Sequence, residues 1–244
     1  MACIILLKVV INGDCLKNKG GKNYGKKLAR CAFLLLTLCL SLSTVGCKKS
    51  NEINKIKGDV DTALTLCSIR YSINTNDEFY EKEQEFLDEN SPVISSYINE
   101  INKALVATPL VGKLEEKYGK KLFDSIRLDL TTFSNEIIED LQEENKLCSR
   151  YSKLIASAKI PFDGKILNLS QFAPYTTNVD RNVRKEAEAA TAKFFEENEK
   201  EFDDIYDSLV KVRDRMAKKL GFENYIPLGY ARLGRTDYDS EMVK

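Results

Sequence analysis

Residues 201–220, EFDDIYDSLVKVRDRMAKKL, decide the fold class of this 244-residue chain. Gly221 follows directly and favours a helix end, while Lys218 and Lys219 lie in the last turn, where the helix dipole favours cations. Apolar side chains recur at steps of three and four residues, the period of a helix with one buried face, at Phe202, Ile205, Tyr206, Leu209, Val212, Met216 and Leu220. This stretch therefore predicts a long amphipathic helix.

The same period continues through most of the chain from Asn51 onward. Residues 180–200 predict a second long helix, and residues 133–155 predict a third of about six turns. Shorter helices are predicted at Ile53–Ser72, at Glu78–Asp88, at Pro92–Ala107 and as a broken pair across Leu110–Leu130.

One stretch departs from the helical period. In KIPFDGKILNLSQF, residues 159–172, the pair Asp163-Gly164 stands between two short apolar runs, and Asp-Gly accepts the positive φ angles of a two-residue β-turn. The sequence therefore predicts a mainly α fold with one embedded β-hairpin.

Residues 1–47 have a different composition and predict a leader in front of a helical body, residues 48–244. They hold seven basic residues and one acidic residue, and residues 31–47, CAFLLLTLCLSLSTVGC, carry no charge. A basic region before a short apolar run is typical of a secretory signal, because a membrane span needs about 20 residues. A buried core helix is the structural alternative for the apolar run.

The end of the apolar run predicts a lipid attachment site. Thr44-Val45-Gly46-Cys47 resembles the lipobox of bacterial lipoproteins, in which a small residue precedes the modified cysteine. We therefore expect Cys47 to carry lipid and the chain to be a membrane-associated lipoprotein. A misassigned start and a cytoplasmic location are the alternative.

Several classes of chemistry are excluded by composition. The chain has no histidine, so it cannot build a Ser-His-Asp or Cys-His pair, a His-ligated zinc site or a histidine general base. Its 37 basic and 37 acidic residues balance, which gives no electrostatic reason to expect nucleic acid as a partner. Residues 48–244 are mildly acidic, with 30 basic and 36 acidic residues.

Cysteines and carboxylates outside the leader suggest structural roles. Cys67 and Cys148 lie on apolar sides of helical patterns, so two buried small side chains are favoured over a disulfide. No CxxC pair occurs, so a zinc knuckle or thioredoxin-type site is unsupported. The acidic clusters Glu78–Glu85, Glu139–Glu144 and Glu196–Asp204 lie among lysines and predict solvated helix faces with i,i+4 pairing.

The stretch PLGYARLGRTDYD, residues 227–239, is a candidate functional segment. It brings together aromatic and charged side chains at Tyr230, Arg232, Arg235, Asp237 and Tyr238. Such a cluster forms either one wall of a ligand site or a hydrogen-bonded corner that joins two helices.

From about Glu52 onward the sequence resembles the oligoendopeptidase F branch of the thimet oligopeptidase family of zinc metallopeptidases. The matching stretches begin SIRYSINTND at residue 68, EIIEDLQEEN at residue 136, DRNVRKEAEA at residue 180 and LGYARLGRTD at residue 228. The resemblance implies a helical, bowl- or clamshell-shaped enzyme around a channel that admits oligopeptides. It also implies a zinc centre formed by HExxH and a further glutamate.

No position of this chain matches that zinc centre, so the resemblance supplies no catalytic residue, no metal ligand and no cofactor in this chain. It implies the N-terminal, substrate-channel part of the fold without the catalytic half, and Tyr230, Arg232, Arg235 and Tyr238 are the candidate channel wall. Two hypotheses follow. The chain is a truncated oligopeptidase that needs a C-terminal catalytic half, or it is a non-catalytic, lipid-anchored helical protein that binds peptides.

Overall fold

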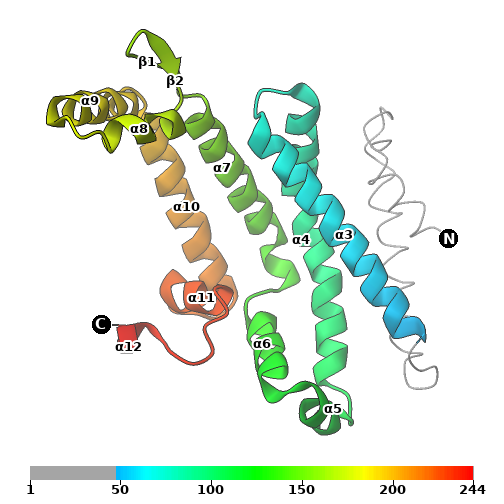
Figure 1. Ribbon diagram of the computed structural model, residues 1–244. Helices are drawn as coiled ribbons and strands as arrows, with labels where there is room; N and C mark the ends of the chain where they lie inside the picture. Colours follow the sequence, from blue (N-terminus) through cyan, green and yellow to red (C-terminus); the bar gives the residue numbers. More distant parts are fainter. Residues whose placement is uncertain (1–47, 244) are drawn as a thin grey trace.

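The computed structural model describes residues 48–243, with side chains from residue 54 onward. In this part of the chain the long helices stand side by side in a row (Figure 1). They are α3 (Lys48–Ile73), α4 (Glu78–Val106), α7 (Ile138–Ala156) and α10 (Glu199–Lys219). Helix α4 packs on α3 and on α7, and α7 packs on α10, so α7 lies inside the row.

Shorter elements lie at the two ends of these long helices (Figure 1). One end carries strands β1 (Ile160–Phe162) and β2 (Lys165–Leu167), the 3-10 helix η3 (Leu169–Phe172), and helices α8 (Ala173–Thr176) and α9 (Arg181–Glu197). The other end carries α5 (Val111–Tyr118), α6 (Lys120–Thr131), η2 (Asn135–Ile137), α11 (Tyr225–Arg232) and α12 (Ser240–Val243). No described helix is both long enough and apolar enough to cross a membrane.

The amphipathic helix predicted at residues 201–220 is confirmed as α10. Its buried side chains are Ile205, Val212, Met216 and Ala217, which face α7 and α11. At its end, Phe222 N donates to Ala217 O at 2.9 Å and Gly221 N donates to Lys218 O at 3.1 Å, with Gly221 at φ 84°. This is the paired hydrogen-bond pattern that glycine favours at a helix C-terminus.

The predicted break before Pro92 is wrong, because α4 runs without interruption from Glu78 to Val106. Proline has no N–H, so the carbonyl of Asp88 one turn earlier loses its helical partner. Here Asn145 of α7 donates its Nδ2 to that carbonyl at 3.1 Å. A side chain from the neighbouring helix therefore satisfies the oxygen that the proline leaves free, and the helix continues.

The predicted hairpin and the predicted broken helix pair are both confirmed. Strands β1 and β2 pair antiparallel, with Phe162 opposite Lys165, and the turn residues Asp163 and Gly164 have φ of 50° and 67°. Gly119, at φ 92°, separates α5 from α6. The fold is therefore mainly α with one hairpin, as the sequence predicts.

Two apolar clusters hold the C-terminal part together. The first joins the hairpin and η3 to α9 through Ala158, Ile160, Leu167, Phe172, Ala187 and Phe194. The second joins η2, α10 and α11 through Ile137, Met216, Ala217 and Leu228. Helix α7 connects the two clusters, since it follows η2 directly and ends just before β1.

Candidate functional site

Two grooves run along opposite sides of α7. The α4–α7 groove has a volume of about 710 Å³, and α4 and α7 supply most of its walls. The α7–α10 groove has a volume of about 580 Å³ and is lined by Cys148, Tyr151, Ser152, Phe202, Asp203, Ile205, Tyr206, Leu209 and Arg213. Both are open concave surfaces of the size that accepts a ligand side chain or short peptide.

The α4–α7 groove is lined mostly by charged residues and is bridged by charge pairs. Lys146 Nζ lies 3.2 Å from Glu89 Oε1, and Lys153 pairs with Glu81. At its base Tyr71 donates its hydroxyl to the carbonyl of Ser149 at 3.3 Å. These contacts hold α4 and the neighbouring α3 against α7. The charged side chains they involve are therefore paired with one another across the helix interface.

The α7–α10 groove has an aromatic wall. The rings of Tyr151 and Phe202 meet edge to face with centroids 6.0 Å apart, and Tyr206 on the same wall is 71% exposed. Cys148 is exposed here, which corrects the prediction that it is buried, whereas Cys67 is buried as predicted and both thiols are free. Partial desolvation of the thiol in the groove, with the nearby Glu144 charge, raises the pKa of Cys148 and so disfavours its thiolate form.

Beside this groove lies a buried carboxylate that the sequence analysis assigned to a solvated face. Glu144 is 4% exposed, which corrects that prediction for the Glu139–Glu144 cluster. Arg213 Nε donates to Glu144 Oε1 at 2.7 Å, and Arg232 donates to both carboxylate oxygens at 3.2 and 2.8 Å. Arg232 also donates to the Tyr225 hydroxyl at 3.3 Å. We call Glu144, Arg213, Arg232 and Tyr225 the Glu144 cluster.

Asp140, one turn earlier on α7, repeats the arrangement. It is 3% exposed, and its two oxygens accept from Arg215 Nε and Lys219 Nζ, both at 2.6 Å. Arg215 also donates to Glu143 at 2.5 Å. A charge is buried only when it is paired, so these contacts are what permits two carboxylates at this interface. Together they fix α7 to α10 and, through Arg232, to α11.

Both carboxyl groups are held in the charged form. Burial alone would raise the pKa of Glu144, but the hydrogen bonds and charges of Arg232 and Arg213 outweigh it and hold the pKa below its usual range. The pKa of Asp140 is lowered in the same way, with Lys219 and Arg215 outweighing burial. Neither carboxylate is free to act as an acid or base near neutral pH.

These lowered pKa values predict an acid-labile fold. The ionised carboxylates of Asp140 and Glu144 stabilise the fold fully above the pKa of about 4 that a carboxyl group has in the unfolded chain. That stabilisation is lost as the pH falls through the lower pKa values of the folded state. We expect the free energy of unfolding, measured with urea at constant ionic strength, to fall below about pH 4. The fall should be steeper in the wild type than in the Asp140→Asn, Glu144→Gln variant. Equal slopes would contradict this assignment.

The four predicted channel-wall residues make two separate sets of contacts in the described chain. Arg232 turns toward Glu144 and holds α11. Tyr230 and Tyr238 meet edge to face at 6.5 Å, and the Arg235 guanidinium lies 5.1 Å from the Tyr238 ring centroid. The stretch thus contains an ion-paired corner and a separate aromatic–arginine stack. A contact of Tyr230, Arg232, Arg235 and Tyr238 with substrate stays a prediction.

The described residues form no metal centre, and the predicted lipid site lies outside them. The side chains of the described part of the chain bring together no group of three His, Cys, Asp or Glu that could hold a metal ion. Zinc therefore does not fit the residues described. Cys47 and the predicted leader lie outside the described residues, so lipid attachment stays a prediction.

Comparison with known proteins points to one family. A family model described as the peptidase M3 N-terminal domain matches residues 47–133. A solved structure of PZ peptidase A with inhibitor 2 is 46% identical, with a TM-score of 0.81, over 89% of this chain and 39% of that one. An oligoendopeptidase F from Bacillus anthracis str. Ames is 43% identical, with a TM-score of 0.82, over 93% and 42%. No curated protein matches the chain.

A third structure gives the same result. An oligoendopeptidase F from crystals grown by microfluidic seeding is 45% identical, with a TM-score of 0.82, over 88% of this chain and 39% of that one. The chain thus spans 39–42% of the length of these relatives. Sequence and fold agree that this chain belongs to the M3 peptidase family: residues 47–133 match its N-terminal domain, and the chain is similar to structures of the oligoendopeptidase F type.

Proposed function

We propose that this chain supplies the N-terminal, peptide-binding part of a zinc-dependent oligopeptidase whose catalytic half lies outside these 244 residues. The observation that carries the proposal is identity of 43–46% over nearly the whole chain to structures of which it spans 39–42%. The absence of histidine supports the assignment of catalysis to another part, because HExxH needs two imidazole ligands that this sequence does not contain.

The grooves beside α7 are better suited to binding a peptide than to catalysing its cleavage. The α7–α10 groove offers aromatic and aliphatic side chains, and its one thiol has a raised pKa. Its neighbouring carboxylates are held ionised by arginine and lysine. Such a surface binds and orients a peptide, while the catalytic half would hold zinc and activate water. Oligopeptides and that half are the proposed partners.

A chimera tests the proposal. Residues 47–243 of this chain would replace the matched part of the Bacillus anthracis oligoendopeptidase F. We expect the folded chimera to cleave an internally quenched oligopeptide and to retain zinc after dialysis. The 244-residue chain alone should do neither. Turnover with bound zinc by these 244 residues alone would contradict the proposal that the catalytic half lies outside them. A folded, zinc-loaded but inactive chimera would contradict the peptide-binding role.

A further inference from the structure

The connection from α4 to α6 exposes apolar side chains next to lysines. Leu110, Tyr118 and Leu122 are 57%, 58% and 48% exposed. Lys113 and Lys117 lie four positions apart on one face of α5, next to its N-cap residue Leu110, and Tyr118 is the last residue of the helix. We define the α5 tip as Leu110, Lys113, Lys117, Tyr118, Lys120 and Leu122.

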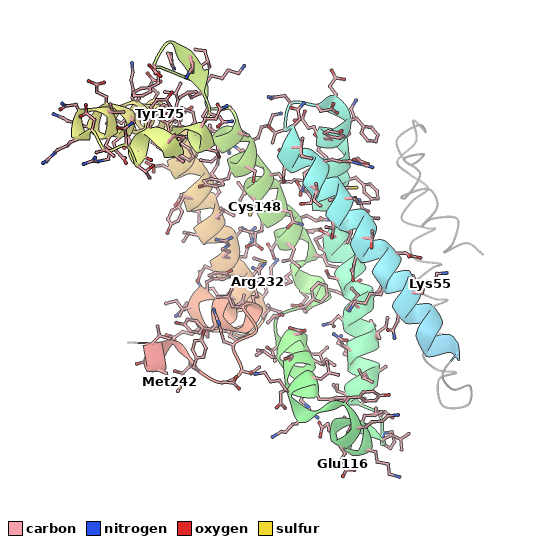
Figure 2. All side chains as sticks on the ribbon, viewed as in Figure 1. Lys55, Glu116, Cys148, Tyr175, Arg232 and Met242 are labelled. Atoms are coloured by element: carbon pink, nitrogen blue, oxygen red, sulfur yellow. The ribbon has the colours of Figure 1, made fainter. Side chains whose placement is uncertain are left out.

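The lysines of the α5 tip are available for an external partner. Lys113, Lys117 and Lys120 make no ion pair with any residue that the structure describes, and Lys117 Nζ lies 5.2 Å from the Tyr118 ring centroid. The local acid Glu115 is taken up by Arg127 of α6. Glu116 lies at the same end of the molecule and adds one exposed carboxylate (Figure 2). The ammonium groups of the tip therefore outnumber its free carboxylates.

The α5 tip lies at the end of the molecule where the described chain begins. Helices α3 and α4 form an antiparallel pair of 26 and 29 residues, or about 39 and 44 Å. The start of α3 and the end of α4 are therefore at the same end (Figure 1). Lys55 and Lys57 of α3 are exposed near this end, and the described chain begins one residue after Cys47, the predicted lipid site.

The opposite end of the long helices, away from α5, is acidic. Residues 77–89 at the start of α4 and residues 196–207 at the start of α10 hold fourteen acidic and two basic residues. Both segments lie away from α5 (Figure 1). The molecule is thus polarised along its helices, with the basic, partly apolar end at the start of α3. An anionic surface attracts this end and repels the other.

We propose that the α5 tip is a membrane-contact surface that binds anionic phospholipid headgroups, with Leu110, Tyr118 and Leu122 reaching the boundary of the acyl chains. Lysines beside an anionic leaflet and an aromatic ring at headgroup depth are the elements of peripheral membrane attachment. One acyl chain holds a protein only weakly, and a basic surface supplies a second attachment. The tip would thus orient the helices away from the bilayer.

A fluorescent reporter tests this in the full chain, which contains no tryptophan. Tyr118→Trp places a single indole at the tip, and Tyr206→Trp places one on α10 as the matched control. With vesicles of phosphatidylglycerol and phosphatidylcholine, we expect the emission of Tyr118→Trp alone to shift to shorter wavelength. Vesicles of phosphatidylcholine alone, or high salt, should weaken the shift.

Charge reversal completes the test. Lys113→Glu, Lys117→Glu and Lys120→Glu together should raise the lipid concentration for the half-maximal shift by about a hundredfold or more. Lys159→Glu, Lys185→Glu and Lys200→Glu make the same change in net charge on exposed residues outside the tip and should leave it unchanged. With folding checked by far-ultraviolet dichroism, a chain that sediments with vesicles without a Tyr118→Trp shift overturns the proposal. An equal shift in Tyr206→Trp, or insensitivity to the reversal at the tip, also overturns it.

Discussion

Glu144→Gln is expected to lower the free energy of unfolding by about 2–3 kcal/mol. The substitution keeps the shape of the side chain but removes the charge that Arg213 and Arg232 share. Removing one partner of a buried ion pair is costly because the other charge stays desolvated. The side chains of Arg213 and Arg232 are 33% and 32% exposed, so water solvates them in part, and the expected cost falls at or below the range of about 3–5 kcal/mol for a fully buried pair.

Urea unfolding at neutral pH measures the effect, and Glu139→Gln is the matched control. Glu139 is on the same helix but exposed, so its substitution should change the free energy of unfolding by less than about 0.5 kcal/mol. A double-mutant cycle of Glu144→Gln with Arg232→Gln should show a coupling of about 1–3 kcal/mol, because the second substitution removes the stranded charge. Equal effects of the two glutamate substitutions would contradict the Glu144 cluster.

The Glu144 cluster also shows where sequence reasoning failed. Asp140 and Glu144 stand one helical turn apart in a run of charged residues, which is the pattern of a solvated helix face. What distinguishes them is the complementary set Arg213, Arg215 and Lys219 on α10. Periodicity within one helix carries no information about which charges of two distant helices will face each other, so the pair became visible only in the structure.

Regular elements were predicted because their signals are local. The turn at Asp163-Gly164 needs positive φ at adjacent residues, and the apolar stripe of α10 repeats with the helical period. The break at Pro92 was wrong for the opposite reason. The residue that keeps α4 continuous, Asn145, is 57 positions from Asp88 in sequence. The grooves beside α7 depend on the same long-range packing, so the sequence did not reveal them.

Phe172→Ala is expected to lower the free energy of unfolding by about 3–5 kcal/mol. Its ring is 2% exposed, with its centroid 5.2 Å from that of Phe162 in the hairpin and 6.2 Å from that of Tyr175 in α8. Truncation leaves a cavity where the hairpin, η3 and α9 meet, and a two-stranded hairpin has little independent stability. Phe195→Ala is the matched control, since that ring is 43% exposed and its removal opens no enclosed space.

The loss of stability in Phe172→Ala should also be larger in one part of the chain than in another. Phe172 belongs to the apolar cluster of the hairpin and α9, whereas Met216 and Leu228 belong to the separate cluster of η2, α10 and α11. Hydrogen exchange followed by mass spectrometry should therefore show amides of residues 158–197 losing protection in Phe172→Ala, while those of residues 212–231 keep most of theirs. A uniform loss of protection would mean that the two clusters unfold as one cooperative unit. A loss of stability no larger than that of Phe195→Ala would mean that the hairpin and α9 are held together by contacts other than this ring.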